Sequence, residues 1–179
     1  MASTILLTID VEDWFQVENF KRHIPFSTWS SYELRVEKNV HRFLDLFDSI
    51  KVANNPATSN QQPAIRNMEP GHELSAISYE ESSKKNIKAT FFILGWIAER
   101  LPHLVREIQD RGHEVASHGF NHNLCTEESK RRLKQDLLDS KKLLEDIIGV
   151  PVSGYRAPSF SISDNTLKVR KKRNFLSGF

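Results

Sequence analysis

The stretch IKATFFILGWIAERLPHLVREIQDRGHEVASHGFNH, residues 87–122, decides the fold class of this chain. Its start, 87–94, is rich in β-branched and aromatic residues, which predicts a buried strand. A helix follows, with Pro102 in its first turn and Gly112 at its carboxyl end. HEVAS, residues 113–117, then predicts a second strand. The stretch therefore reads as strand, helix, strand.

The same alternation continues on both sides of this stretch. Residues 4–10, TILLTID, form a nearly continuous apolar run, as expected for a strand buried on both faces. Apolar residues at helical spacing predict helices over 34–48 and 127–148, and a short strand over 152–155 follows the second of them. Strands and helices in alternation predict an α/β fold, in which helices pack outside a parallel sheet.

Two segments do not follow this pattern. Residues from about 50 to 86 are rich in Asn, Gln, Ser, Pro and Glu without a sustained period, so we expect a disordered insertion there. Residues 167–179 contain a basic run from Lys168 to Arg173. A single short run of this kind is more often a solvated tail than a nucleic-acid contact, so we expect no nucleic-acid partner.

The composition of the 179 residues is that of a soluble globular domain, with 39% apolar and 27% charged residues. A net charge of +2 predicts no strong preference for nucleic acid or acidic surfaces. The single cysteine, Cys125, excludes an intramolecular disulfide. Neither a secretory signal nor an apolar run of about 20 residues is visible, so we expect a cytoplasmic protein without a membrane span.

Chemically active side chains follow three of the predicted strands. DVEDWF, residues 10–15, places three carboxylates in four positions directly after the first apolar run. SHGFNH, residues 117–122, places two histidines four residues apart, and Arg156 follows the last predicted strand. The carboxyl ends of parallel strands meet at one edge of a sheet, so we expect these groups to converge.

The spacing of His118 and His122 lets both imidazoles point at one divalent metal ion. With one carboxylate they would form a three-ligand Zn²⁺ site with an open position, the pattern of catalytic zinc. The ion would also offset the repulsion among the clustered carboxylates. The alternatives are two polar surface histidines and an acidic helix cap.

One carboxylate would bind the ion, and a second would take a proton from the attacking water. Asp10 is the better base because it lies at the strand end. Glu12 shares its face by strand alternation, whereas Asp13 requires that the chain has already turned. The sequence leaves the ligand open between these two. Arg156 fits the role of orienting Asp10 and keeping it ionised, and the alternative is an ordinary surface arginine.

Together, TIDVEDWF, the run from residue 88 to 122 and GYRAPSFS resemble the polysaccharide deacetylase family, the NodB-homology carbohydrate esterases. The likeness is greatest to the branch found with exosortase and exopolysaccharide loci, and it covers about residues 4–48 and 87–166. It implies a distorted (β/α) barrel that removes N-acetyl groups from a polysaccharide with a divalent metal, most commonly Zn²⁺. Carried over by position, the metal-ligand roles fall on His118, His122 and either Glu12 or Asp13.

The resemblance also implies which residues have catalytic roles and which elements of the family have no counterpart in this sequence. Asp10 would be the base, Arg156 would steady it, and the backbone N–H of Ser159 would help stabilise the tetrahedral oxyanion. The later strands and the histidine that protonates the leaving amine have no counterpart. We therefore expect residues 1–166 to form a partial barrel with its C-terminal strands missing, followed by a non-family tail. The expected function is a polysaccharide N-deacetylase impaired by truncation; the alternative is an inactive remnant that binds metal or glycan without turnover.

Overall fold

The computed structural model describes residues 5–52, 85–162, 164 and 166. Its central sheet contains three parallel strands in the order β1-β4-β5, namely β1 (Thr8–Val11), β4 (Thr90–Ile93) and β5 (Glu114–Ser117). In the register of the sheet, Asp10 pairs with Phe92, and Phe92 pairs with Ala116. An isolated parallel bridge from Ser117 to Tyr155 extends the sheet beyond β5. The predicted α/β fold with a parallel sheet is confirmed.

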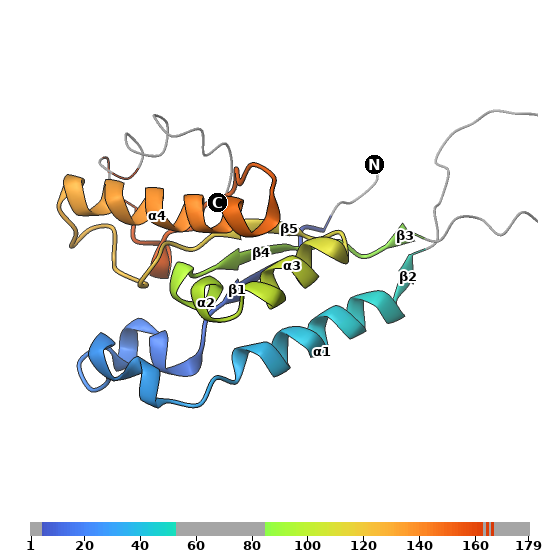
Figure 1. Cartoon of the computed structure of the whole chain (residues 1–179), viewed down its shortest axis with the longest axis horizontal. Helices are drawn as coiled ribbons and strands as arrows, with labels where there is room; N and C mark the ends of the chain where they lie inside the picture. The colour runs from blue at the N-terminus through green and yellow to red at the C-terminus, as the bar shows by residue number, and fades with distance from the viewer. Residues whose placement is uncertain (1–4, 53–84, 163, 165, 167–179) are drawn as a thin grey trace, which may run out of the picture.

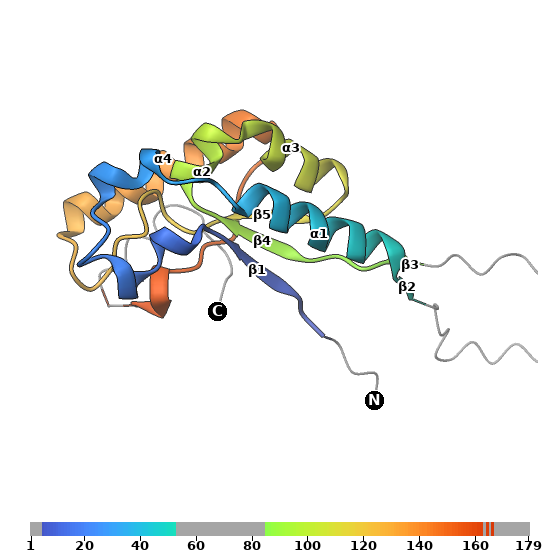
Figure 2. The same cartoon turned by 90° about the horizontal axis from the view of Figure 1, so that it is seen from below.

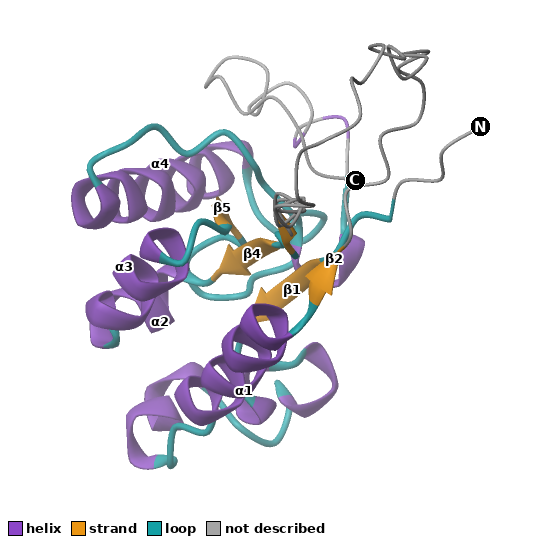
Figure 3. Cartoon of the chain, turned by 90° about the vertical axis from the view of Figure 1, so that its right-hand side faces the viewer, coloured by secondary structure: helices purple, strands orange, loops and turns teal. Residues whose placement is uncertain are grey.

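The α-helices follow one another in an arc along one side of the sheet (Figure 3). They are α1 (Val36–Ser49), α2 (Gly95–Arg100), α3 (Pro102–Asp110) and α4 (Lys130–Ile148). Short 3₁₀ helices lie at the carboxyl ends of the strands (Figures 1 and 2): η1 (Trp14–Gln16), η2 (Glu18–Phe20), η3 (Phe26–Ser31) and η4 (Pro158–Phe160). Outer helices around parallel strands are the arrangement of a partial (β/α) barrel.

The helix boundaries follow from local chemistry. Pro102 occupies the first turn of α3, where its missing N–H costs nothing, and Gly112 just beyond that helix has a φ of +78°. Ser129 caps α4 by accepting the N–H of Arg132, and Gly149 ends that helix with a φ of +72°. The predicted apolar stripe of α3 is buried: Leu101, Leu104, Val105 and Ile108.

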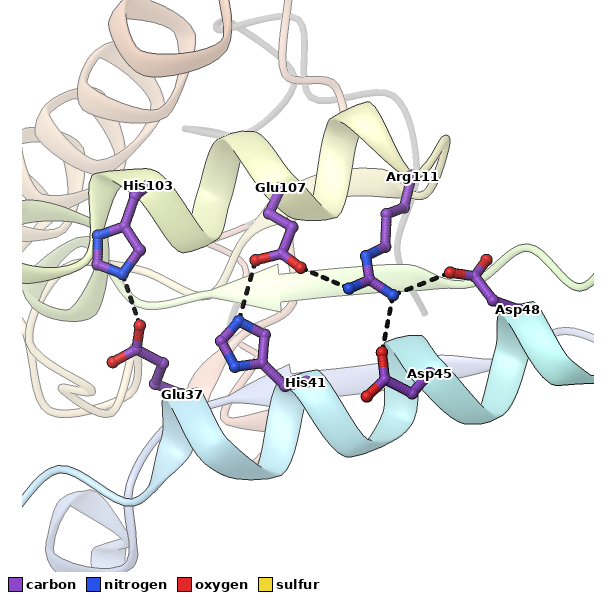
Figure 4. Close-up of polar contacts among 7 residues, drawn as sticks. All are labelled: Glu37, His41, Asp45, Asp48, His103, Glu107 and Arg111. Atoms are coloured by element: carbon purple, nitrogen blue, oxygen red, sulfur yellow. Dashed lines mark hydrogen bonds and ion pairs between the residues drawn. The ribbon is translucent and has the colours of Figure 1, made fainter.

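Helices α1 and α3 lie side by side and are joined by a regular series of polar contacts (Figure 4). Each contact joins residues 66 positions apart: Glu37 to His103 at 2.6 Å, His41 to Glu107 at 2.9 Å, and Asp45 to Arg111 at 3.0 Å. The contacts recur every four residues, so they fall one helical turn apart on both helices. Arg111 also contacts Asp48 at 2.9 Å and Glu107 at 2.7 Å.

Aromatic packing fixes the segment that follows β1. Phe15 is fully buried, and its ring centroid lies 5.3 Å from that of Tyr32 and 5.9 Å from those of Trp29 and Trp96. Offset and edge-on aromatic pairs of this kind add stabilisation beyond their buried area. The cluster anchors the 3₁₀ segment against α2, so the chain after Val11 leaves the sheet along a defined path.

Two predicted strands differ from the structure. Ile5 and Leu6 lie before β1 and are 81% and 86% exposed, so the first strand is shorter than predicted and is not buried on both faces. The reason is that β1 is an edge strand, with only β4 beside it among the described residues. The strand predicted over 152–155 is reduced to the bridge at Tyr155.

Strands β2 (Lys51–Val52) and β3 (Lys85–Asn86) pair antiparallel and bring together the two ends of the segment between them. The predicted insertion falls mainly on residues 53–84, which lie outside the described residues, as does the predicted tail, 167–179. Within the described part of the chain, no helix has the length and apolar character needed to cross a bilayer.

Candidate metal centre

Asp13 anchors the loop that follows β1. It is only 3% exposed and serves as the N-cap of η1, with Oδ1 accepting the N–H of Trp14 at 2.9 Å. Its Oδ2 atom accepts the backbone N–H groups of Arg35 at 2.6 Å and Val36 at 3.0 Å. Three donors from two segments therefore use the Asp13 carboxylate, which ties the loop to the start of α1.

Glu12, by contrast, faces the two histidines. Its Oε2 atom lies 2.9 Å from Nε2 of His122 and 3.9 Å from Nε2 of His118. One ligand atom from each of the three residues lies within 4.8 Å of the others. Atoms bound to one zinc ion at about 2.1 Å are separated by about 3.4 Å, so the cluster is close to the size of a zinc site. Both imidazoles are buried.

The surroundings of the cluster favour the protonation states that a metal needs. Nδ1 of His118 lies 2.9 Å from the backbone carbonyl oxygen of Arg156, so Nδ1–H donates there and Nε2 keeps its lone pair. Burial lowers the pKa of His118, which favours the neutral ring. Burial opposes the ionisation of Glu12, but contact with His122 and the charges of both histidines outweigh it and hold the pKa of Glu12 below its ordinary value.

Two buried atoms of this cluster are poorly satisfied. Among the described residues, Nδ1 of His122 has no hydrogen-bond partner, and Oε2 of Glu12 has only its 2.9 Å contact with Nε2 of His122, which lacks standard hydrogen-bond geometry. Unsatisfied buried polar atoms are rare because each loses its interaction with water. One carboxylate and two neutral imidazoles form a donor set suited to Zn²⁺ and similar transition metals. The residues thus fit a divalent metal ion.

Asp10 and Arg156 form a pair beside the cluster. Nη1 of Arg156 lies 2.6 Å from Oδ1 of Asp10, and Nη2 donates to Oγ1 of Thr8 at 2.8 Å. The guanidinium carbon stands 4.1 Å from the ring centroid of Phe92 on β4. Two N–H donors of the guanidinium and one face of its plane are thus in contact with neighbouring side chains. These contacts fix the guanidinium, which in turn holds the Asp10 carboxylate in a single orientation.

The cluster and the Asp10 pair share one pocket of about 210 Å³. It contains most of the predicted site residues, namely Asp10, Glu12, His118, His122, Arg156 and Ser159. Asp13 is absent both from this lining and from the metal-sized cluster of the described residues. Other lining residues were not predicted: Val17, Glu18 and Asn19 carry no motif, and Ala157 and Phe160 belong to GYRAPSFS but had no assigned role.

Backbone strain accumulates around this pocket. His122, Ser159 and Phe160 have φ values of +54°, +48° and +52°. They are the non-glycine residues in the left-handed region among those described, and each such conformation costs about 1–3 kcal/mol. All three line the pocket. Strain of this kind persists where the surrounding structure enforces it.

Helix α4 supplies two supports that the sequence analysis missed. Oδ2 of Asp136 accepts the N–H of Phe120 at 3.0 Å, and Oγ of Ser140 lies 2.8 Å from Oγ of Ser117. Burial raises the pKa of Asp136 to about 6. A sequence signal existed for Ser140, because it falls in the buried stripe of α4, whose other members are Leu133, Leu137 and Leu144. A hydroxyl in an apolar stripe needs a partner.

Comparison with known proteins decides the family. The polysaccharide deacetylase family model matches residues 70–176, which is more than half of the chain. The chain belongs to the polysaccharide deacetylase family. This agrees with the resemblance seen in the sequence, and the fold is accordingly that of the NodB-homology deacetylases.

Similar proteins include deacetylases from several organisms. The chain is 27% identical over 149 residues to a peptidoglycan-N-acetylglucosamine deacetylase of Bacillus cereus, a match that covers 83% of the chain and 50% of the relative. It is 34% identical over 88 residues to a second match with the same name and organism, covering 49% of the chain and 41% of the relative. The chain thus spans about half the length of these curated relatives or less.

Solved structures show the same fold. A CE4 family pseudoenzyme from Bacillus anthracis superimposes with a TM-score of 0.60 at 16% identity, over 94% of this chain and 40% of that one. A peptidoglycan N-acetylglucosamine deacetylase superimposes with a TM-score of 0.58 at 18% identity, over 96% and 53%. At these identities the likeness concerns the fold alone.

Proposed function

We propose that this deacetylase-family chain removes N-acetyl groups from a polysaccharide with a divalent metal ion held by Glu12, His118 and His122. The ion that we expect there is Zn²⁺. The observation that carries this proposal is the shared pocket, in which the metal-sized cluster lies beside the Asp10–Arg156 pair. A metal site and an oriented carboxylate in one pocket are the two parts that hydrolysis of an amide requires.

Within this proposal, Glu12 is the acidic ligand. Its carboxylate faces both imidazoles, whereas three backbone N–H groups already use the oxygens of Asp13. Asp13 would have to give up contacts that tie the loop to α1 before it could bind an ion. The acidic-cap alternative thus describes Asp13, and the metal-ligand hypothesis applies to Glu12.

The chemistry follows from the placement of the remaining groups. A divalent ion bound here would polarise the acetyl carbonyl and lower the pKa of the attacking water. Asp10 would accept the proton of that water, and Arg156 orients the Asp10 carboxylate through its 2.6 Å contact. The backbone N–H of Ser159, which lines the same pocket, would donate to the oxyanion as the carbonyl becomes tetrahedral. When the C–N bond then breaks, the leaving amine needs a proton, and Asp10 would return the one that it took from the water.

The proposed substrate is a polymer that contains N-acetylglucosamine. The Bacillus cereus relatives are named for that sugar, and the sequence resembles the branch found with exopolysaccharide loci. An open pocket lined by carboxylates, Asn19 and Phe160 suits a hydroxylated ring with one apolar face. A cytoplasmic location remains a prediction from the sequence.

The test uses the full chain with Zn²⁺ and an N-acetylated chito-oligosaccharide, and it measures released acetate and, separately, zinc uptake. Wild-type turnover that falls about 10²–10⁴-fold in Asp10→Asn, with zinc uptake unchanged, would support the proposal. Zinc uptake without acetate release would favour the alternative, a remnant that binds without turnover. No zinc uptake would contradict both.

A further inference from the structure

We infer that Asp136 and Ser140 of α4 form a clamp that sets the position of His122 relative to His118. This inference rests on the proposed metal site and names the residues that hold its geometry. Both act through the backbone of the loop between the two histidines, so they are positioning residues.

The carbonyl groups of the loop are bound by the start of α2. The N–H of Gly95 donates to the carbonyl oxygen of Gly119 at 2.9 Å, and the N–H of Trp96 donates to that of Phe120 at 3.0 Å. The first amides of a helix lack partners within the helix, so they are available for this contact. One side of the loop is therefore fixed to α2.

The amide groups of the same loop are bound through α4. The Asp136 carboxylate accepts the N–H of Phe120 at 3.0 Å, and the neighbouring N–H of Asn121 also favours its charged form. The N–H of Gly119 donates to Oγ of Ser117 at 3.2 Å, and that oxygen lies 2.8 Å from Oγ of Ser140. Asp136 and Ser140 are one turn apart on α4. Asp136 therefore binds the amide of Phe120 directly, and Ser140 supports the amide of Gly119 through the hydroxyl of Ser117.

The fit between this carboxylate and the loop is close. Gly119 has a φ of +80°, and a Cβ atom there would lie 2.9 Å from Oδ2 of Asp136. That separation is shorter than real Cβ contacts, so the carboxylate occupies the space that a side chain at position 119 would need. Glycine at position 119 accommodates both the positive φ and the close approach of the Asp136 carboxylate.

The clamp acts on one histidine more than on the other. His118 is held independently, by its N–H to the carbonyl oxygen of Ile93 and by its ring to that of Arg156, both at 2.9 Å. His122 has a strained φ of +54° and lies two residues after Phe120, whose N–H Asp136 binds. Loss of the clamp would let this backbone relax, and the His122 ring would leave Glu12.

The test compares Asp136→Ala and Asp136→Asn with wild type by competition between the full chain and a zinc chelator. Supporting partners of metal ligands typically contribute about 10–100-fold to metal affinity, so we expect a loss of that size in Asp136→Ala. Asparagine keeps the volume and one acceptor, and we expect a smaller loss. Asp139→Asn is the matched control, because Asp139 lies on the same helix, is exposed and contacts only Gln135 among the described hydrogen bonds.

Two further readouts separate positioning from general loss of structure. In the metal-free chain, hydrogen exchange at the amide of Phe120 should quicken in Asp136→Asn while the amides of β4 stay protected. The visible spectrum of bound Co²⁺ should change in Asp136→Asn but not in Asp139→Asn. Zinc affinity and a Co²⁺ spectrum like those of wild type in both Asp136 variants would overturn this inference alone. A wild-type chain that binds no zinc would overturn the proposed function together with it.

Discussion

The imidazole of His118 donates through Nδ1 to the backbone carbonyl of Arg156, whose guanidinium holds the carboxylate of Asp10. One residue thus orients both a proposed metal ligand and the proposed base. The main chain of Arg156 serves the histidine, and its side chain serves the aspartate. Substitutions of the side chain should therefore separate the two tasks.

We predict that Arg156→Lys lowers turnover while zinc affinity stays at the wild-type level. The backbone carbonyl that accepts from His118 remains, but a lysine cannot contact Asp10 and Thr8 together as the planar guanidinium does. Misplacement of a catalytic group by about 1 Å costs roughly 10²-fold in rate. Acetate release and zinc titration on the same sample measure the two effects. A parallel loss of zinc affinity would show that the two tasks are not separable.

Glu12 and Asp13 should respond in opposite ways to substitution by alanine. Asp13→Ala leaves the buried N–H of Val36 and that of Arg35 without an acceptor, so we expect a loss of about 1–3 kcal/mol in the free energy of unfolding. Zinc affinity of the folded fraction should persist. Glu12→Ala should abolish tight zinc binding with little loss of stability in the metal-free chain. Denaturant unfolding and zinc titration of both variants test this pair, and zinc binding lost only in Asp13→Ala would reverse the assignment.

The stability of the metal-free chain should fall below about pH 6.5 partly because of His113. Burial, together with the positive charge of Lys88, lowers the pKa of His113 below its ordinary 6.5, and Nδ1 accepts the N–H of Ala89 at 3.2 Å. The unfolded chain therefore takes up the proton first as the pH falls, which favours unfolding; above about pH 6.5 this contribution is constant.

His113→Asn removes the titrating ring and keeps an acceptor near the Ala89 N–H. Its unfolding free energy should depend less on pH between about 6.5 and 5 than that of wild type, whereas the exposed control His23→Asn should follow wild type. Denaturant unfolding across this range provides the measurement. Parallel curves for wild type and His113→Asn would disprove the role of His113.

The contacts between α1 and α3 should contribute modestly and in a salt-dependent way (Figure 4). Arg111 contacts three carboxylates, those of Asp45, Asp48 and Glu107, from a partly exposed position. Exposed ion pairs contribute about 0.2–1 kcal/mol each, so we expect Arg111→Ala to cost about 1 kcal/mol at low salt and less at 1 M salt. Lys142→Ala, which loses one exposed contact with Asp146, is the control. A cost that does not change with salt would point to lost packing instead.

Much of the fold was predictable because its determinants are local. Helix α3 follows from Pro102, an apolar stripe and Gly112, and α4 ends at Gly149 as predicted. The extent of β1 was not predictable, because whether an apolar run is buried depends on which strands lie beside it. The reduction of the last predicted strand to a bridge at Tyr155 has the same cause.

The candidate site was predictable as a set of residues but not as a set of contacts. Strand ends and histidine spacing placed Asp10, His118 and Arg156 at one edge of the sheet. The choice between Glu12 and Asp13 depends on how the chain turns after Val11, which the aromatic cluster around Phe15 determines. The role of Asp136 was hidden, because a lone aspartate on a helix carries no motif and its partners are backbone amides.

The central claim is that Glu12, His118 and His122 bind one divalent ion. Its most direct test is X-ray diffraction from zinc-soaked crystals of the full chain at the zinc absorption edge. We predict one strong anomalous peak from a zinc ion that is bound to Oε of Glu12 and Nε2 of both histidines at about 2.0–2.2 Å. The Asp13 carboxylate should still accept its hydrogen bonds from backbone N–H groups. An ordered pocket without a peak, or a zinc ion bound away from these three atoms, would contradict the claim.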